Sequence, residues 1–144
     1  MIFSETYTVA PKDYVAAGDA SRKIKQILKK IGLDADLVRK ASIAAYEAEI
    51  NMVIHADGGK ITLEVGEGRI RLVCADTGPG IEDIEKAMQE GYSTADEEAQ
   101  AIGFGAGMGL PNIKFNSDKL DITSSKEGTT LDIVINLPAD GGIH

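Results

Sequence analysis

Three short motifs follow one another between residues 47 and 109, and they constrain the fold more than any other feature of the chain. The first is Glu47-Ala-Glu-Ile-Asn51, the second is Asp76-Thr-Gly-Pro-Gly80, and the third is Gly103-Phe-Gly-Ala-Gly-Met-Gly109. They supply a carboxylate and an amide one helical turn apart, an acid followed by a glycine turn, and a glycine loop that leads into a helix. For the three motifs to act together, the fold must bring a helix face, the end of a strand and this loop to one place.

Composition excludes several classes of partner. The chain has 144 residues, enough for one domain with a buried core, and a formal net charge of −8. Nucleic acids and anionic membranes are bound mainly through positive charge, so neither is expected as a partner. The sequence contains no long apolar run and no signal peptide, and its single cysteine provides neither an internal disulfide nor a metal-ligand set. We therefore expect a soluble, cytoplasmic protein.

The spacing of apolar and turn residues predicts both helices and strands. Period-two, β-branched runs predict strands over residues 2–9, 60–65, 69–74, 119–124 and 129–137. Helical spacing predicts helices over residues 12–31, 34–56, 81–90 and 107–116, with a loop over 91–105. This order indicates an α+β fold, a two-layer α/β sandwich with a mixed, mostly antiparallel sheet and helices on one face. We expect a single domain over residues 1–137 and a tail over residues 138–144.

The predicted helix over residues 34–56 has faces of different character. Its apolar stripe consists of Leu37, Ile43, Tyr46, Ile50, Val53 and Ile54. Glu47, Asn51 and His55 recur every four residues, so they lie along another face, about 6 Å apart per step. Glu49 points elsewhere and is expected at the surface. The polar face can be an ordinary solvated one, but Asn is a mediocre helix former and needs a reason to occupy a helix interior.

The groups on this face suit phosphoryl transfer. Mg²⁺ prefers hard oxygen ligands and retains waters, so the amide oxygen of Asn51 together with phosphate oxygens would be enough to hold it. The carboxylate of Glu47 could accept a proton from a hydroxyl group or a water aligned on a γ-phosphate. His55 is expected to pack or to form hydrogen bonds rather than to bind a metal.

Asp76 follows the predicted strand over residues 69–74, and glycines come directly after it. A carboxylate at this place can accept a hydrogen bond from an exocyclic amine such as that of adenine. Gly78 and Gly80 allow positive φ and let a flat base approach the backbone. The segment can equally be an ordinary strand-to-helix turn, since Asp, Gly and Pro are favoured turn residues.

The third motif places alternating glycines, Gly103 to Gly109, directly before Leu110 and Pro111. Such a loop brings backbone N–H groups close to an anion, and the start of a helix adds a favourable dipole. The sequence matches neither the Walker A motif nor the dinucleotide fingerprint. A flexible linker is the alternative, but Phe104, Met108 and Leu110 are unlike a Gly/Ser spacer.

In this order the motifs resemble the N, G1 and G2 boxes of the GHKL, or Bergerat-fold, ATPases. The resemblance covers roughly residues 35–136 and rests on three motifs in family order. Within that superfamily, the segment ending at His55 is similar to the anti-sigma-factor serine kinases of the RsbW and SpoIIAB type. Residues 91–94 and 105–111 are more similar to the switch kinases of the RsbT type, so both subfamilies stay open.

The resemblance implies that ATP and Mg²⁺ are bound, and it implies roles for individual residues. Glu47 would be the catalytic base, Asn51 the Mg²⁺ ligand and Asp76 the acceptor for the adenine amine. Further contacts to ATP would come from Gly78, Gly80, Thr94, Gly103, Gly105, Gly107, Met108, Gly109, Leu110 and Thr129. Thr130 is an alternative to Thr129 near the adenine, and residues 91–105 would form a lid.

The activity implied by the resemblance is that of an ATP-dependent serine/threonine protein kinase. Its substrate would be a small STAS-domain antagonist protein in a partner-switching pathway of the anti-sigma or stressosome type. A sigma factor or another signalling protein is a further expected partner, and family members often pair as homodimers through the first strand. The alternative is a nucleotide-gated protein-binding module, in which catalysis is incidental.

Overall fold

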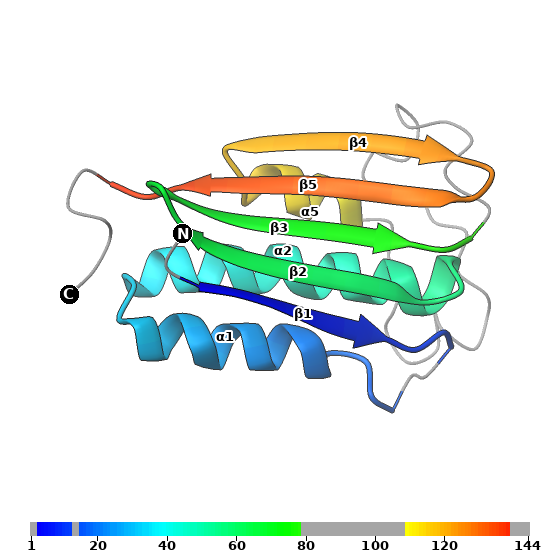
Figure 1. Cartoon of the computed structure of the whole chain (residues 1–144), viewed down its shortest axis with the longest axis horizontal. Helices are drawn as coiled ribbons and strands as arrows, with labels where there is room; N and C mark the ends of the chain where they lie inside the picture. Colours follow the sequence, from blue (N-terminus) through cyan, green and yellow to red (C-terminus); the bar gives the residue numbers. More distant parts are fainter. Residues whose placement is uncertain (1–2, 13–14, 79–108, 139–144) are drawn as a thin grey trace.

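The computed structural model describes residues 3–12, 15–78 and 109–138, which form an antiparallel sheet with helices against one face (Figure 1). The strands are β1 (Phe3–Val9), β2 (Gly59–Gly66), β3 (Arg69–Asp76), β4 (Lys119–Ser125) and β5 (Gly128–Asn136). The helices are α1 (Asp19–Ile31), α2 (Ala35–His55) and α5 (Gly109–Phe115). The strand order is β1-β2-β3-β5-β4, and all neighbours in the described sheet are antiparallel. The predicted two-layer α+β class is confirmed.

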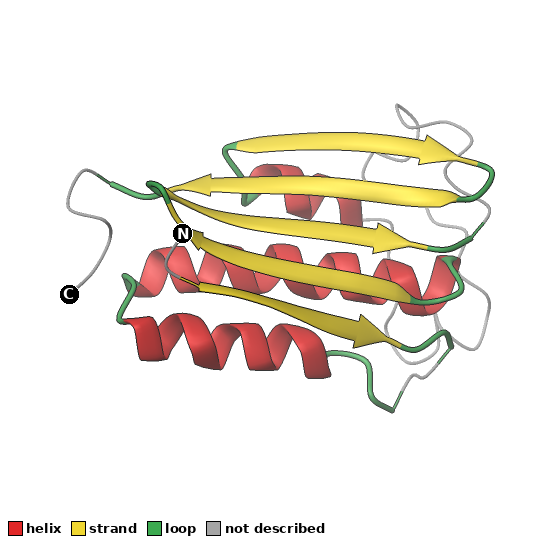
Figure 2. Cartoon of the chain, in the orientation of Figure 1, coloured by secondary structure: helices red, strands yellow, loops and turns green. Residues whose placement is uncertain are grey.

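Alternation along the strands builds the core between the sheet and the helices, which lie on the same side of it (Figure 2). On the inner strands every second residue is buried, namely Ile61, Leu63, Val65, Ile70, Leu72, Cys74, Leu131, Ile133 and Ile135. Full burial of an aliphatic side chain of this size contributes about 1.5–3 kcal/mol. Most residues of the other parity are polar or charged and lie on the opposite face, so a shift of the register by one residue would exchange core and surface.

Two hairpins, β2–β3 and β4–β5, lie side by side in the sheet and bring the end of β3 next to the start of β5. In the turn between β2 and β3, Glu67 has φ of 54° and Gly68 has φ of 77°, the positive values that suit the right-handed twist of a hairpin. The predicted hairpins over residues 60–74 and 119–137 are both present; β2, β3 and β4 are slightly longer than predicted, and β5 has the predicted length but begins and ends one residue earlier. Because β3 lies between β2 and β5, its last residue, Asp76, lies beside the first residues of β5.

Helix α2 lies centrally in the helical layer and packs against α1, α5 and the sheet. The predicted apolar stripe on this helix is partly wrong, because Ile43 is only half-buried and Tyr46 is 37% exposed. The residues buried on α2 are Leu37, Val38, Ala41, Ala44, Ala45, Ala48, Glu49, Ile50, Met52, Val53 and Ile54. Several of these are alanines, and their small side chains let α2 pack closely against the elements around it.

Helix α1 begins at Asp19, later than the predicted start at residue 12. The residue before it, Gly18, has φ of 98°, a left-handed conformation that cannot continue a helix towards the N-terminus. Gly32 ends the helix as expected, with φ of 89° and a backbone N–H that donates to carbonyl groups of the last turn. The shortened α1 still packs Ile24 and Leu28 into the core.

Several predictions fall outside the described residues. These are the helix over residues 81–90, the loop over 91–105, the first two residues of the helix over 107–116, and residues 139–144 of the tail. In the part of the chain that the structure describes, no helix is both long enough and apolar enough to cross a bilayer.

Candidate active site

The site is built around the face of α2 that carries Glu47 and Asn51. Both side chains are half-buried, and both belong to the same side of the helix because they are four residues apart. His55, one turn further on, is half-buried at the last position of α2. The predicted geometry of this face is therefore present, although it lies within the helical layer rather than on a fully solvated surface.

The start of α5 packs directly against this face. A Cβ placed on Gly109 would lie 3.2 Å from Oδ1 of Asn51 and 3.5 Å from Oε2 of Glu47. A larger residue would fill the space between the two functional groups, so glycine here keeps that space open. The side chains of Leu110 and Ile113 are buried in the core and anchor α5 in this position.

Asn112 is a site residue that the sequence motifs did not identify. Its Nδ2 donates a hydrogen bond of 3.4 Å to Oε1 of Glu47, from a position one turn into α5. The residue follows the glycine motif by three positions, and no spacing rule links it to a glutamate so distant in sequence. Only the packing of α5 against α2 brings the amide and the carboxylate together.

Burial raises the pKa of Glu47 above its ordinary value, and the hydrogen bond from Asn112 acts in the opposite direction. A carboxylate with a raised pKa holds a proton more strongly, which makes it a better general base as long as it is ionised at the working pH. The partly desolvated position of Glu47 thus fits a proton acceptor better than a solvated surface residue.

Asp76 ends β3 and contacts β5. The backbone N–H of Thr129 donates to Oδ1 of Asp76 at 2.8 Å, and the hydroxyl groups of Thr129 and Ser124 are hydrogen-bonded at 2.8 Å. Partial burial raises the pKa of Asp76, while the hydrogen bond from Thr129 opposes the rise. Asp76 keeps one carboxylate oxygen outside this bond, which suits an acceptor for an amine.

The structure distinguishes between the two threonines considered for this place. Thr129 is buried and has the same parity along β5 as Leu131 and Ile133, so it faces the helices. Thr130 has the opposite parity and pairs with Ala75 on the other side of the sheet. Thr129 is therefore the threonine that accompanies Asp76 on the side of the candidate site.

Glycines hold the end of β3 close to its neighbours. A Cβ on Gly128 would lie 2.2 Å from the carbonyl oxygen of Asp76, and one on Gly59 would lie 2.4 Å from the carbonyl oxygen of Ala75. Gly78 approaches the C-terminal end of α2, where its Cβ would meet Ala56 at 3.1–3.2 Å. These contacts fix the position of Asp76 relative to α2 and explain why larger residues do not fit there.

Backbone hydrogen bonds join the same three segments. The N–H of Asp57 donates to the carbonyl oxygen of Thr77 at 2.6 Å, and the N–H of Thr77 donates to that of Gly58 at 3.2 Å. The N–H of Gly78 donates to the carbonyl oxygen of Glu127 at 3.2 Å. The segment after α2, the end of β3 and the turn before β5 therefore form one connected rim.

Glu49 corrects one sequence-based expectation. It is not a surface residue, because only 2% of it is exposed and its carboxylate accepts the backbone N–H groups of Gly18, Ala20 and Ser21 at 2.9–3.2 Å. It thereby caps the start of α1 from a neighbouring helix, in place of a side chain at the N-cap, which is Gly18. A charged residue among small apolar ones in a helix was the only sign of this role in the sequence.

Other expected site residues lie outside the described residues. These are Gly80, Thr94, Gly103, Gly105, Gly107 and Met108, and their contacts with ATP stay predictions. Leu110, which was also expected near ATP, is described and has its side chain in the core. Within the described ranges, no group of three or more His, Cys, Asp or Glu residues could hold a metal ion. The amide oxygen of Asn51 is a hard donor of the kind that suits a magnesium ion held mainly by phosphate and water.

A family model and several known proteins match most of the chain. Residues 10–135 match the model of the family described as the histidine kinase-like ATPase domain. The chain is 30% identical to the serine/threonine-protein kinase RsbT of Bacillus subtilis over 127 residues, which cover 85% of this chain and 87% of RsbT. It is 36% identical over 93 residues to the anti-sigma F factor of Caldanaerobacter subterraneus, with 61% of this chain and 62% of that protein covered.

A further anti-sigma F factor, from a Thermoanaerobacter species, is 35% identical over 100 residues, which cover 67% of this chain and 60% of that protein. The chain thus spans about three-fifths of the anti-sigma F factors that it matches. Among solved structures, the RsbU and RsbW domains of a Mycobacterium tuberculosis protein superpose with a TM-score of 0.65 and 18% identity. That match covers 94% of this chain and 32% of the other, and at this identity it concerns the fold alone.

Proposed function

Because the chain belongs to the histidine kinase-like ATPase family, we propose that it is an ATP-dependent serine/threonine protein kinase. The observation that carries this proposal is the convergence of Glu47, Asn51 and the start of α5 in one partly desolvated place. Mere binding of a nucleotide does not require a base, whereas transfer to a hydroxyl group does. The similarity to RsbT supports the same activity.

Each residue of the site would have a definite task. ATP, when bound, supplies the γ-phosphoryl group. Glu47 would accept the proton that the attacking hydroxyl group loses, and the amide oxygen of Asn51 would bind the magnesium ion. The free oxygen of Asp76 would accept a hydrogen bond from the adenine amine, next to Thr129. Transition states of phosphoryl transfer need positioning and charge stabilisation more than covalent help, which these groups would supply in part.

We propose a small STAS-domain antagonist protein as the substrate, phosphorylated on serine or threonine in a partner-switching pathway. RsbT and the anti-sigma F factors, to which the chain is similar, support a regulatory protein partner. The test mixes the purified chain with Mg-ATP and STAS-domain proteins from the same genome, and mass spectrometry locates phosphoserine or phosphothreonine. Absence of phosphorylation on every such protein would contradict the proposed substrate.

A second candidate is a nucleotide-gated binding module that holds a sigma factor. The similarity to anti-sigma F factors favours it, although that match covers only part of each protein. One experiment distinguishes the two functions: complex formation and phosphorylation of the partner protein are measured with ATP and with ADP. A stable complex that depends on the bound nucleotide and forms without phosphorylation would favour the module. Turnover of a protein substrate favours the kinase.

Replacing Asn51 with Ala should weaken Mg²⁺-dependent binding of ATP. We expect a loss of at least about tenfold, since even changes in the outer shell of a metal site typically cost that much. Calorimetric titration with ATP in magnesium and in EDTA gives the magnesium-dependent part of the affinity. Asn136→Ala is the matched control, because Asn136 is exposed at the far end of β5. An unchanged magnesium-dependent affinity in Asn51→Ala would refute the ligand role.

Replacing Asn112 with Ala should move the acid limb of the pH–rate profile to higher pH. Glu47 acts as a base only when ionised, and the hydrogen bond from Asn112 lowers its pKa. Without that bond the pKa of Glu47 rises further, so more of Glu47 is protonated at low pH and the variant is slower than the wild type there. At high pH, where Glu47 is ionised, the rate of the variant approaches that of the wild type. The profile of kcat/KM is measured for the wild type, for Asn112→Ala and for Lys114→Ala, an exposed neighbour on α5. A limb that stays in place or moves to lower pH would contradict this role.

A further inference from the structure

Two hydroxyl groups meet on the helix side of the sheet, near the turn between β4 and β5. Ser124 lies directly opposite Thr129 in the register of the two strands, and their hydroxyl oxygens are 2.8 Å apart. Thr129 is 5% exposed, and Ser124 is half-buried. Ser124 has the same parity along β4 as Leu120 and Ile122, which pair with core residues of β5. Both hydroxyl groups therefore lie on the side of the candidate site.

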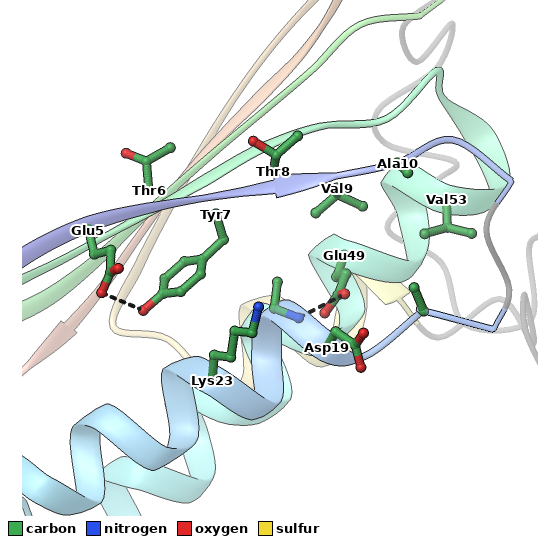
Figure 3. Close-up of a pocket in the computed structure, with 12 residues that line it drawn as sticks. Glu5, Thr6, Tyr7, Thr8, Val9, Ala10, Asp19, Lys23, Glu49 and Val53 are labelled. Atoms are coloured by element: carbon green, nitrogen blue, oxygen red, sulfur yellow. Dashed lines mark hydrogen bonds between the residues drawn. The ribbon is translucent and has the colours of Figure 1, made fainter.

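The surroundings of this pair differ from those of an ordinary contact between strands. Hydroxyl pairs across strands commonly stabilise a sheet, and Thr6 and Thr62 form such a pair at 3.0 Å among exposed residues. Figure 3 shows that Thr6 points away from the helices. The pair of Ser124 and Thr129 instead adjoins a carboxylate, because the backbone N–H of Thr129 donates to Oδ1 of Asp76 at 2.8 Å. One residue of β5 thus holds the carboxylate and presents a hydroxyl group beside it.

The direction of the hydrogen bond between the two hydroxyl groups decides what Thr129 offers to a ligand. Each hydroxyl group carries a single proton. If Ser124 donates, the oxygen of Thr129 is the acceptor, and the proton of Thr129 is available to the ligand. If Thr129 donates to Ser124, its oxygen can only accept from the ligand. Next to the acceptor Asp76, Thr129 is therefore either a donor or a second acceptor.

These two arrangements suit different purines. Adenine has a donor, the 6-amino group, next to an acceptor, N1, whereas guanine has an acceptor, O6, next to a donor, N1–H. The ionised carboxylate of Asp76 only accepts, so it suits the amino group of adenine. The neighbouring N1 then needs a donor, which Thr129 supplies when Ser124 donates to it. A bridging water changes nothing, because its two protons go to Asp76 and N1 and its oxygen must accept from Thr129.

We propose that Ser124 is a positioning residue, which donates to Thr129 and thereby turns the hydroxyl proton of Thr129 towards N1 of adenine. Ser124 then contributes to the selection of adenine over guanine without touching the nucleotide. The inference rests on the proposed binding of ATP, and it adds a residue of the edge strand β4 that lies outside the three sequence motifs. A hydroxyl group that is already oriented loses less freedom when the base binds.

The test compares ATP with 1-deaza-ATP, which keeps the 6-amino group but has a C–H group in place of N1. Calorimetric titration of the full chain with Mg²⁺ present gives both dissociation constants, and we call the value for 1-deaza-ATP divided by that for ATP the N1 ratio. For the wild type we expect an N1 ratio of about ten, because the deaza base leaves the donor of Thr129 without an acceptor. GTP should bind at least about tenfold more weakly than ATP.

Ser124→Ala leaves the hydroxyl group of Thr129 without a fixed partner. We expect the N1 ratio to fall to about three, because the hydroxyl group can then turn away from the C–H group, and the preference for ATP over GTP to fall by a similar factor. Ser124→Thr keeps a hydroxyl group and should keep the wild-type ratio. Thr129→Val has no hydroxyl group, so its N1 ratio should be close to one.

Thr123→Val is the matched control for the loss of a hydroxyl group from β4. Thr123 precedes Ser124, is exposed and has the opposite parity, so its side chain lies on the other face of the sheet. Its N1 ratio should equal that of the wild type. Circular dichroism without nucleotide verifies that each variant is folded.

A purely structural bond between the strands would give another pattern. Ser124→Ala would then weaken ATP and 1-deaza-ATP equally and leave the N1 ratio at the wild-type value. That result, a wild-type ratio close to one, or a ratio for Ser124→Thr as low as that for Ser124→Ala would overturn the inference while ATP still binds. Absence of ATP binding to the wild type would instead contradict the proposed function on which the inference rests.

Discussion

Glu47→Gln is expected to lower the rate of phosphoryl transfer by a factor of about 10²–10⁴, the usual contribution of a general base, while the affinity for Mg-ATP stays close to that of the wild type. Gln has the same shape as Glu, and its oxygen can still accept the hydrogen bond from Asn112. The variant thus loses the ability to take a proton but keeps the packing between α2 and α5. A pattern of this kind is typical of a group that acts mainly in the transition state.

Single-turnover kinetics with radiolabelled ATP and a STAS-domain substrate would measure this effect, and calorimetry would measure nucleotide affinity in parallel. Glu67→Gln is the control, because Glu67 lies in the exposed turn between β2 and β3 and carries the same charge. Equal turnover by Glu47→Gln and the wild type would remove the role of base. A loss of nucleotide binding in Glu47→Gln would instead mean that Glu47 serves mainly in binding.

Glu49→Ala is expected to destabilise the fold by about 3 kcal/mol, because three buried or half-buried N–H groups at the start of α1 lose their acceptor. For a domain of this size the loss corresponds to a decrease in Tm of about 6–12 °C. Urea unfolding followed by circular dichroism measures the free energy of unfolding directly.

Asp36→Ala serves as the control for this prediction. Asp36 is an exposed acid in the first turn of α2, paired with Arg39 at 2.8 Å and with Lys40 at 3.4 Å, and exposed pairs contribute about 0–1 kcal/mol. If Glu49→Ala were no less stable than Asp36→Ala, the hydrogen bonds between Glu49 and the start of α1 would not contribute to the stability of the fold. The start of α1 would then be held by its apolar contacts alone.

Much of the fold could be predicted because its signals are local. The strands of both hairpins follow from alternation, and Gly68 and Gly128 mark places where the backbone turns or approaches a neighbour. The pairing of Glu47 with Asn51 follows from helical spacing alone, and Asp76 follows from its place after a strand. These predictions need no knowledge of which elements meet in space.

The failures share one physical cause, which is contact between distant segments. Glu49 was expected at the surface because helical spacing gives its direction but not the position of α1, which covers it. The position of the neighbouring elements also decides which residues of α2 are covered: Ala44 and Ala48 are buried, whereas Tyr46 is partly exposed. Asn112 was missed because its partner, Glu47, lies on another helix. The start of α1 was placed too early, since the left-handed conformation of Gly18 becomes apparent only with its contacts.

The central claim is that the face shared by α2, the start of α5 and the end of β3 binds magnesium-complexed ATP. Isothermal titration of the full chain with a non-hydrolysable ATP analogue, in magnesium and in EDTA, tests this most directly. We predict saturable binding of one nucleotide per chain that weakens when magnesium is removed. Absence of heat and of any thermal shift with millimolar nucleotide would contradict it.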